Sequence, residues 1–461
     1  MFKKILVANR GEIALRVIRA CKELQIPSVA VYSEADEHSL HVRLADESVC
    51  IGPAISAKSY LSIENILQAA KDTGADAIHP GYGYLAEKRE FAIACQDNGI
   101  VFIGPKPENL ALAGNKIAAK TAMEKAGVPV TPSSPGGVPT VEEAKVFANQ
   151  IGYPVMVKAS GGGGGRGIKI CHDDEEMEEE FPMAKMEGRT SFGNDEVYVE
   201  KFLQKPRHIE FQILADKHGN VIHLGERECT IQRRYQKLIE ESPSPALTPE
   251  LRKAMGKAAV DAAKAVDYEN AGTVEFLLDG DMNFYFMEIN SRIQVEHPVT
   301  ELVTGVDLVK EQIRLAAGGT LDYTFEDLKL RGWAIECRIN AEDPSRNFMP
   351  SPGTITDFHA PAGFGVRLDS HLYPGYELPP YYDSLIGKLI AFDLTREGAI
   401  QVMRRALQEF IIGPIKTTIP LFLTVMDDED FQAGRFDTSF ITRYVPNEDE
   451  DDDDDDDDDD D

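Results

Sequence analysis

The stretch 153–170, YPVMVKASGGGGGRGIKI, places five consecutive glycines, Gly161 to Gly165, between two apolar segments that are typical of β-strands. Glycine has no side chain, so the backbone N–H groups of such a loop can approach a polyphosphate closely. Lys158, just upstream, adds a positive charge for phosphate oxygens. A flexible linker is the alternative, but linkers rarely join two strands. Because the Walker spacing G-x-x-x-x-G-K-[ST] is absent, we predict a phosphate-binding loop that is not a P-loop.

Upstream of this loop, strand and helix patterns alternate. Apolar runs predict strands, and apolar residues at helical spacing predict helices between them: strands at 4–8, 28–32, 77–78 and 101–103, helices at 12–24, 60–73 and 91–98. This alternation predicts βαβ units and a doubly wound parallel sheet in residues 1–115. The turn after the first strand lacks G-x-G-x-x-G, so no dinucleotide site is expected there.

Downstream, the pattern changes to antiparallel strands with fewer helices. We predict helices at 116–125 and 249–266, and hairpins that pair 208–215 with 221–224 and 272–278 with 283–289. From Trp333 onward short strands dominate, at 334–340, 353–359, 365–368 and 386–392, with a capping helix at 396–409. The chain is therefore α/β and α+β, with predicted domains at 1–115, 116–330 and 331–446 and an acidic tail at 447–461.

Two carboxylates of the second predicted hairpin suggest a metal site. Glu275 and Glu288 lie on its two strands, and Asn290 follows. An oxygen-rich group of this kind suits Mg²⁺ held together with ATP phosphates, whereas exposed hairpin charges are the plain alternative. Polar residues then alternate as far as Glu296, so five could line one face of an extended strand. Burying such a face is costly unless it binds something. His297, before a proline, is more easily explained as structural.

Basic residues complete the set of candidates. Arg233, Arg234 and Lys237 cluster in the stretch 232–241, which alone is typical of a solvated face. Arg338 alternates with apolar residues on a predicted strand, where a structural ion pair is the plain interpretation.

The net charge of −30 overstates the acidity of the folded part. Removing the 14 acids of Glu448 to Asp461 from the 78 in the chain leaves 64 against 48 basic residues, so nucleic-acid binding gains no support. The tail cannot bury apolar surface and should be disordered; it is either a solubilising appendage or a docking element for a basic partner.

No apolar run is long enough for a membrane span, and six scattered cysteines without a C-x-x-C pair favour a reducing cytoplasm.

Together these features resemble the biotin carboxylase family, from Lys3 to about Tyr444. The resemblance includes the opening ANRGEIA at 8–14, HPGYG at 79–83, the glycine loop, RHIE at 207–210, QRR at 232–234, the run 288–298 and YYDS at 381–384. So many matches in one order are highly specific. The family implies an N-terminal αβ domain, a central ATP-grasp domain whose lobe at about 132–203 closes as a mobile lid, and a C-terminal β-rich domain.

The resemblance also implies roles for individual residues. ATP is expected to contact Lys116, Lys158, Gly162, Gly163, Gly164, Gly165, Arg166, Gly167, Glu200, Lys201, Leu203, His208 and Gln232. Mg²⁺, or Mn²⁺ in its place, is expected at Glu275 and Glu288, with Asn290 beside them. Bicarbonate and biotin are expected among Tyr82, Lys237, Arg292, Gln294, Val295, Glu296 and Arg338.

The implied chemistry is the ATP-dependent carboxylation of biotin through carboxyphosphate. In this scheme Glu296 is the general base for bicarbonate, Arg338 stabilises the biotin enolate, and Lys237 and Arg292 hold the anionic groups. The nearest match to a biotinyl Ala-Met-Lys-Met sequence is Met183-Ala-Lys-Met186, which lacks the proper context. We therefore expect biotin on a separate carrier protein or domain. We also expect a carboxyltransferase subunit as a partner, and neither nucleic acid nor a membrane.

The family commonly forms a homodimer, and Arg19, Glu23, Phe364 and Arg367 match positions at its interface; Arg19 and Glu23 could equally be a simple i,i+4 pair. Two positions depart from the family pattern: Tyr235 replaces a histidine, and Lys88 replaces an asparagine.

Two alternatives remain open, namely another ATP-grasp ligase with an acyl-phosphate intermediate and a non-catalytic nucleotide-binding scaffold. The sequence does not choose the final acceptor among acetyl-CoA, propionyl-CoA, pyruvate and other 2-oxoacids.

Overall fold

The computed structural model describes residues 1–159 and 168–445. Its N-terminal domain contains a parallel sheet in the order β3-β2-β1-β4-β5, as predicted for a doubly wound domain. The strands are β1 (Ile5–Val7), β2 (Ser28–Tyr32), β3 (Glu47–Cys50), β4 (Ala77–His79) and β5 (Val101–Phe102). Two separate apolar clusters contain alternate residues of β1 and β2, so both faces of the sheet are buried.

Helices connect the strands of this domain. They are α1 (Gly11–Glu23), α2 (Leu40–Leu44), α3 (Ile63–Thr73), α4 (Arg89–Asp97) and α5 (Pro107–Ala113). In α3, the Ser62 side chain accepts a hydrogen bond from the amide of Asn65, and Gly74 ends the helix in a left-handed conformation. In α1, the predicted apolar stripe that includes Ile13 and Val17 is buried.

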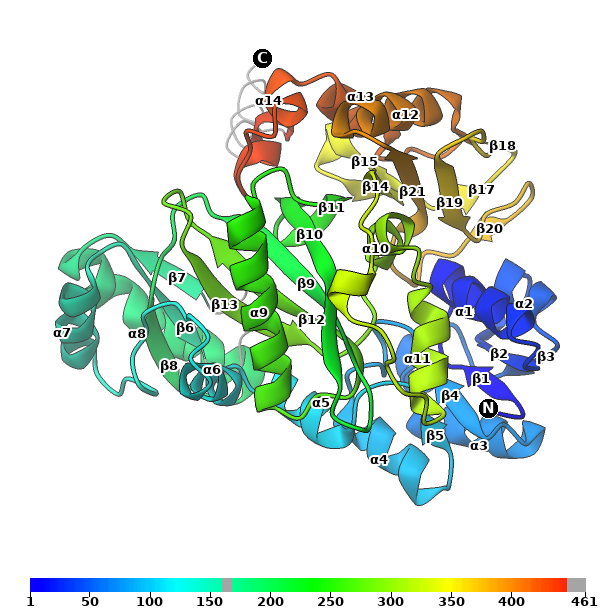
Figure 1. Cartoon of the computed structure of the whole chain (residues 1–461), viewed down its shortest axis with the longest axis horizontal. Coiled ribbons are helices and arrows are strands. Elements are labelled where there is room, and N and C mark those ends of the chain that lie inside the picture. Colours follow the sequence, from blue (N-terminus) through cyan, green and yellow to red (C-terminus); the bar gives the residue numbers. More distant parts are fainter. Residues whose placement is uncertain (160–167, 446–461) are drawn as a thin grey trace, which may run out of the picture.

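The central domain is built around antiparallel strands, and both predicted hairpins, β9–β10 and β12–β13, are confirmed. Figure 1 shows helix α9 lying across one face of the sheet. The elements are α6 (Lys116–Lys125), β9 (Arg207–Ala215), β10 (Val221–Arg233), β11 (Gln236–Ser242), α9 (Pro249–Ala265), β12 (Asn270–Leu278), β13 (Phe284–Asn290), α10 (His297–Thr304) and α11 (Leu308–Ala316).

A smaller unit lies to one side of this sheet (Figure 1). It contains α7 (Val141–Ile151), β6 (Val155–Ala159), β7 (Ile168–Cys171), α8 (Asp174–Phe192) and β8 (Val197–Lys201), with the strands in the order β7-β6-β8. The strands predicted on either side of the glycine loop are therefore present and pair with each other. The loop itself, including Gly162 to Gly167, falls outside the described residues.

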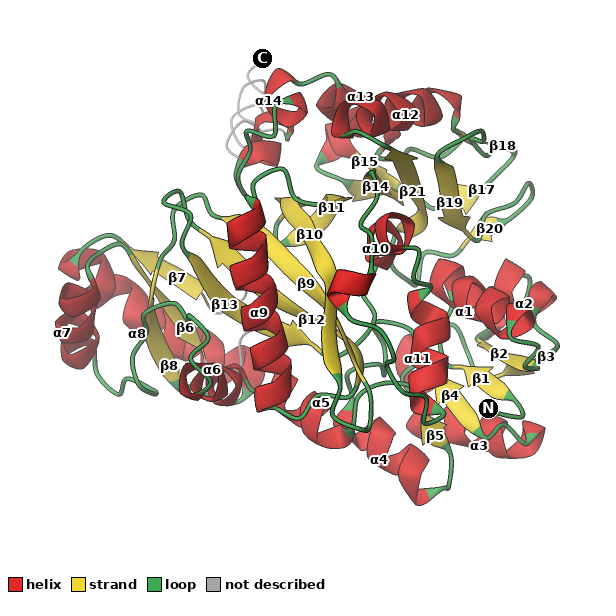
Figure 2. Cartoon of the chain, in the orientation of Figure 1, coloured by secondary structure: helices red, strands yellow, loops and turns green. Residues whose placement is uncertain are grey.

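The C-terminal domain continues the central sheet, because β14 pairs with β11. Together these strands run in the order β13-β12-β9-β10-β11-β14-β21-β19 (Figure 2). The domain contains β14 (Trp333–Asn340), β15 (Glu342–Asp343), β16 (Met349–Pro350), β17 (Gly353–Thr354), β18 (Asp357–His359), β19 (Val366–Ser370), β20 (Glu377–Leu378), β21 (Leu385–Asp393), α12 (Arg396–Glu409), β22 (Ile411–Gly413), α13 (Ile419–Met426) and α14 (Glu429–Gln432).

Two secondary-structure predictions are wrong. The stretch 353–359 is not one strand: β17 pairs with β20 and β18 pairs with β22, and Ile355 is fully buried between them. The run from Glu288 to Glu296 is not one extended strand either, because β13 ends at Asn290 and α10 starts at His297. Pro298 favours this helix start, since proline fits the first turn of a helix. None of the described helices is long and apolar enough to cross a bilayer.

Candidate active site

The Lys237 ammonium on β11 lies among three buried carboxylates. Its Nζ is 2.7 Å from Glu210 Oε2, 2.7 Å from Glu296 Oε1 and 3.1 Å from Glu275 Oε1. Burial alone lowers the pKa of Lys237, but the surrounding acids outweigh this effect and raise its pKa well above the ordinary value. A lysine in this setting stays charged, and it brings together carboxylates that come from β9, β12 and the start of α10.

Glu296 connects Lys237 with Arg338. Its second oxygen, Oε2, accepts a hydrogen bond of 2.9 Å from the Arg338 guanidinium, whose Nε donates to Glu240 Oε1 at 2.6 Å. Burial and the neighbouring Glu210 raise the pKa of Glu296, yet Lys237, Arg338 and other cations hold it below the ordinary value. Glu296 is therefore an ionised carboxylate that can accept a proton. Burial instead raises the pKa of Glu240 to about 7.

Glu275 and Glu288 are directly opposite each other on β12 and β13. The Asn290 amide donates to Glu275 Oε1 at 2.7 Å, and Lys116 Nζ lies 3.5 Å from Glu288 Oε2. Burial raises the pKa of Glu275, but Lys237 and His208 outweigh it and hold the pKa well below the ordinary value. Two carboxylates with an amide beside them form the oxygen-rich donor set that a hard divalent cation requires.

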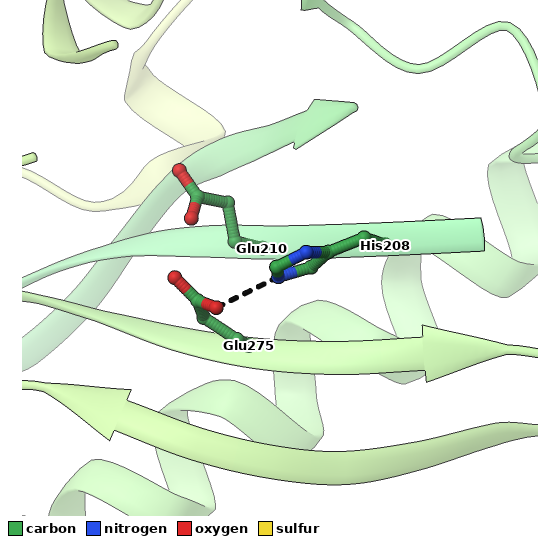
Figure 3. A group of neighbouring side chains, drawn as sticks. All are labelled: His208, Glu210 and Glu275. Carbon is green, nitrogen blue, oxygen red and sulfur yellow. Dashed lines mark hydrogen bonds and ion pairs between the residues drawn. The ribbon is translucent and has the colours of Figure 1, made fainter. Parts of the chain in front are cut away.

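His208 lies within this acidic cluster. Figure 3 shows its ring beside Glu210 and directed at Glu275, and the distance from Nε2 to Glu275 Oε2 is 2.7 Å. The side chain is buried. The family resemblance implies a contact of His208 with ATP; in the structure its Nε2 is engaged with a candidate metal ligand.

The polar residues between β13 and α10 join the same cluster. Arg292 NH1 donates to Gln294 Oε1 at 2.6 Å, and Gln294 Nε2 donates to Glu275 Oε1 at 3.1 Å. Arg292 Nε also forms an ion pair of 3.1 Å with Glu87. The loop thus brings together the residues predicted from the polar alternation, although it is not a strand. His297 is fully buried, and its Nδ1 lies 2.8 Å from the Gln294 carbonyl, which agrees with a structural role.

Several residues expected around ATP pair with one another or with the backbone. Lys158 and Lys120 each contact one oxygen of Glu200 at 2.6 Å, and Lys201 donates to the Gly152 carbonyl at 2.8 Å. Leu203 is half-buried, and Gln232 is directly opposite Lys237 across the β10–β11 hairpin. At the tip of that hairpin Tyr235 is 66% exposed.

Tyr82 of the N-terminal domain and Val295, next to Glu296 in the chain, contact residues that were not predicted for the site. The Tyr82 hydroxyl donates to Glu12, and the Val295 carbonyl accepts from Lys388. Neither Glu12 nor Lys388 is among the predicted site residues.

The sequence analysis missed several supporting residues. Arg227 is fully buried and donates to Glu210, to Gln212 at 2.8 Å and to Thr300 at 3.0 Å. Glu210 and Glu240 are further residues that the sequence did not single out. The available signal was the number of charged residues within predicted strands of the central sheet, since a buried charge needs a partner.

Most of the chain matches known protein families. Residues 1–110 match the biotin carboxylase N-terminal domain, residues 115–324 the ATP-binding domain of the carbamoyl-phosphate synthase L chain, and residues 336–443 the biotin carboxylase C-terminal domain. Biotin carboxylase 1 of Bacillus subtilis is 56% identical over 445 residues, which are 96% of this chain and 99% of that protein. The small subunit of 2-oxoglutarate carboxylase from Hydrogenobacter thermophilus is 53% identical over 96% of this chain and 94% of its own.

Two solved structures have the same three-domain fold. The biotin carboxylase domain dimer of Hydrogenobacter thermophilus 2-oxoglutarate carboxylase, in complex with MgADP, ADP and bicarbonate, matches with a TM-score of 0.91 and 53% identity over 96% of this chain and 98% of that one. Biotin carboxylase of Campylobacter jejuni, in a β-γ-ATP complex, matches with a TM-score of 0.92 and 48% identity over 96% and 99%. The chain therefore belongs to the biotin carboxylase family of ATP-dependent ligases.

Proposed function

We propose that the cluster around Lys237 and Glu296 carries out the biotin carboxylase reaction, in which ATP, bicarbonate and biotin give ADP, phosphate and carboxybiotin. The observation that carries the proposal is the position of the Glu296 carboxylate between Lys237 at 2.7 Å and Arg338 at 2.9 Å. An ionised carboxylate between two cations suits this reaction, because the carboxylate can deprotonate bicarbonate and a cation can then stabilise the biotin enolate.

In the first step, Glu296 takes the proton of bicarbonate as a bicarbonate oxygen attacks the γ-phosphorus of ATP. The bond to the bridging oxygen breaks, ADP leaves and carboxyphosphate forms. Lys237 and Arg292 hold the bicarbonate, with Gln294 and the Val295 amide on the same loop. The ionised state of Glu296 supports its role as base.

Glu275, Glu288 and Asn290 would hold Mg²⁺ or Mn²⁺, and their oxygen donors fit such an ion. When bound, the ion neutralises charge on the transferring phosphoryl group. His208 fixes one oxygen of Glu275, and Lys237 and Asn290 share the other. The lysines Lys116 and Lys158 would contact phosphate oxygens, and the unit at about 132–203, with its glycine loop, would cover the nucleotide.

In the second step, carboxyphosphate breaks into CO₂ and phosphate. The phosphate takes the proton from biotin N1, and N1 then attacks CO₂ to form carboxybiotin. Arg338 would stabilise the negative charge on the ureido oxygen of the biotin enolate. A guanidinium has five N–H donors, and the contacts with Glu240 and Glu296 use Nε and Nη2, so biotin would be bound through another N–H of the same group. Tyr82 would line the biotin pocket.

We further propose that the biotin is carried by a partner protein and passed to a carboxyltransferase. Two relatives that this chain matches over most of their length are named as subunits, one of a pyruvate carboxylase and one of a 2-oxoglutarate carboxylase.

A homodimer through the face around Arg19, Phe364 and Arg367 agrees with the 89% exposure of Phe364. Glu23 on that face forms an ion pair with Lys310 at 2.6 Å. The position of Glu23 is therefore explained without the i,i+4 pair with Arg19. A cytoplasmic location agrees with the six free thiols.

The test is ATP hydrolysis by the purified protein with Mg²⁺ and labelled bicarbonate, with and without free biotin. We expect hydrolysis that depends on bicarbonate, increases with biotin and delivers label to carboxybiotin. Phosphate release with an amine substrate but not with biotin would instead indicate another ATP-grasp ligase. Nucleotide binding without turnover would indicate a scaffold protein.

A further inference from the structure

Lys388 is a fully buried lysine outside the set of residues assigned above. It lies on β21 of the C-terminal domain, and its side chain is 0% exposed. Its Nζ donates to the Val295 carbonyl at 2.9 Å and forms an ion pair of 3.2 Å with Glu12 Oε2. A buried ammonium is strongly unfavourable unless it is paired, so these two contacts should be maintained in the folded protein.

These contacts join all three domains at the edge of the candidate site. Glu12 belongs to α1 of the N-terminal domain, and Val295 to the loop before α10 in the central domain. The other oxygen of Glu12 accepts a hydrogen bond from the Tyr82 hydroxyl. On the sheet, Lys388 is directly opposite Arg338 on β14 and Asp369 on β19, so its position is fixed from both sides.

The Val295 carbonyl belongs to the same planar peptide group as the amide of Glu296. Glu296 is the residue immediately before α10, and its carboxylate connects Lys237 with Arg338. A contact that fixes this peptide plane also fixes the direction in which the Glu296 side chain leaves the backbone. Lys388 reaches this loop through the Val295 carbonyl, so its effect on the Glu296 carboxylate acts through the backbone.

We propose that Lys388 is a positioning residue for Glu296: its ammonium holds the Val295–Glu296 peptide against the C-terminal domain, and Glu12 holds the ammonium in place. The inference rests on the proposed role of Glu296 as the base. A displacement of about 1 Å in a reacting group can lower a rate about 10²-fold, and this is the scale of effect expected.

The test compares Lys388→Met, Lys388→Arg and Glu12→Gln in the full-length protein, with bicarbonate-dependent ATP hydrolysis and ADP affinity as readouts. In Lys388→Met we expect kcat to fall about 10²-fold while ADP affinity and the KM for ATP stay near wild type. Lys388→Arg keeps a cation and should recover most of the loss. Glu12→Gln should lower kcat less than Lys388→Met, because the contact with Val295 remains.

Arg252→Met is the matched control. Arg252 pairs with the buried Glu226 at 2.8 Å, so its loss also leaves a buried carboxylate without its cation, but the pair lies outside the candidate site. If Lys388→Met and Arg252→Met change kcat equally at equal folded fraction, Lys388 is merely structural and the inference fails. If Lys388→Met does not fold, an unchanged kcat in Glu12→Gln overturns the inference, and a lowered kcat with unchanged ADP affinity supports it. A wild-type protein without bicarbonate-dependent hydrolysis would instead contradict the proposed function itself.

Discussion

The guanidinium of Arg338 donates to Glu296 over 2.9 Å, and its Nε donates to Glu240 at 2.6 Å, so one arginine lies between two buried carboxylates. Each carboxylate can hold the guanidinium when the other is engaged elsewhere. Proton uptake by Glu296 would weaken its contact with Arg338 and leave that arginine to Glu240 and to a bound anion. The pair thereby links the state of the candidate base to the availability of the candidate enolate-stabilising group.

Replacement of Glu296 by glutamine should strongly reduce turnover without abolishing nucleotide binding. An amide keeps the shape of the side chain but cannot accept the bicarbonate proton, so bicarbonate-dependent hydrolysis should fall by about 10²- to 10⁴-fold. ADP affinity, measured by titration calorimetry, should stay near wild type. Glu178→Gln, at a 64% exposed side chain, is the matched control. Loss of ADP binding in Glu296→Gln would argue that the residue holds the nucleotide site together and is not the base.

The two candidate metal ligands should respond differently to substitution. Glu288 is more exposed and contacts Lys116 and Asn290, whereas Glu275 also holds Lys237 and His208. Outer partners of metal ligands alone contribute about 10- to 100-fold to metal affinity, so Glu288→Gln should raise the Mg²⁺ concentration for half-maximal rate by at least roughly tenfold. Its rate should recover at high Mg²⁺. Glu275→Gln should remain impaired at saturating Mg²⁺, because Lys237 loses a partner.

Equal and full recovery of both variants at high Mg²⁺ would contradict this division. The measurement is the hydrolysis rate across a Mg²⁺ titration at fixed ATP, repeated with Mn²⁺. Removal of the divalent ion with a chelator should abolish hydrolysis in wild type and in both variants.

Tyr235, where the family usually has histidine, should matter little for nucleotide affinity. The side chain lies at the tip of the β10–β11 hairpin, is 66% exposed and has a φ of 64°, a region that histidine tolerates better than most residues. Exposed substitutions usually change free energies by no more than about 0.5 kcal/mol, so Tyr235→His should shift the KM for ATP by less than about threefold. A larger shift would show that this hairpin tip closes onto the nucleotide.

The sequence predicted the N-terminal sheet, both central hairpins and the placement of Glu275 and Glu288 on the two strands of one hairpin, because each rests on a local periodicity. It did not predict the loop from Ser291 to Glu296. There, the same polar alternation occurs in a turn that brings every second side chain to one cluster. Glu12 and Lys388 were missed because they come together only when the three domains pack. Glu12 is one of several charged residues of α1, and Lys388 lies in the mostly apolar strand β21, so neither segment alone indicates the contact.

Glu336 offers a stability test that needs no substrate. It is fully buried directly opposite Glu240 on β11, and neither of its carboxylate oxygens has a hydrogen-bond partner among the described residues. Burial raises its pKa well above the ordinary value; Lys388 and Arg338 oppose this rise, and Glu240 and Glu296 add to it. The folded protein therefore keeps this proton at a pH where the unfolded chain, with an ordinary pKa near 4.5, has lost it.

Because the folded state binds more protons in this window, stability should fall as the pH rises above the unfolded pKa. Glu336→Gln removes that loss, so its stability relative to wild type should increase between about pH 5 and pH 8, by at most about 1.4 kcal/mol per pH unit. Thermal unfolding of both proteins across this range measures the difference, with Glu178→Gln as the exposed control. A difference that stays constant with pH would mean that Glu336 is ionised in the folded protein and would contradict this prediction.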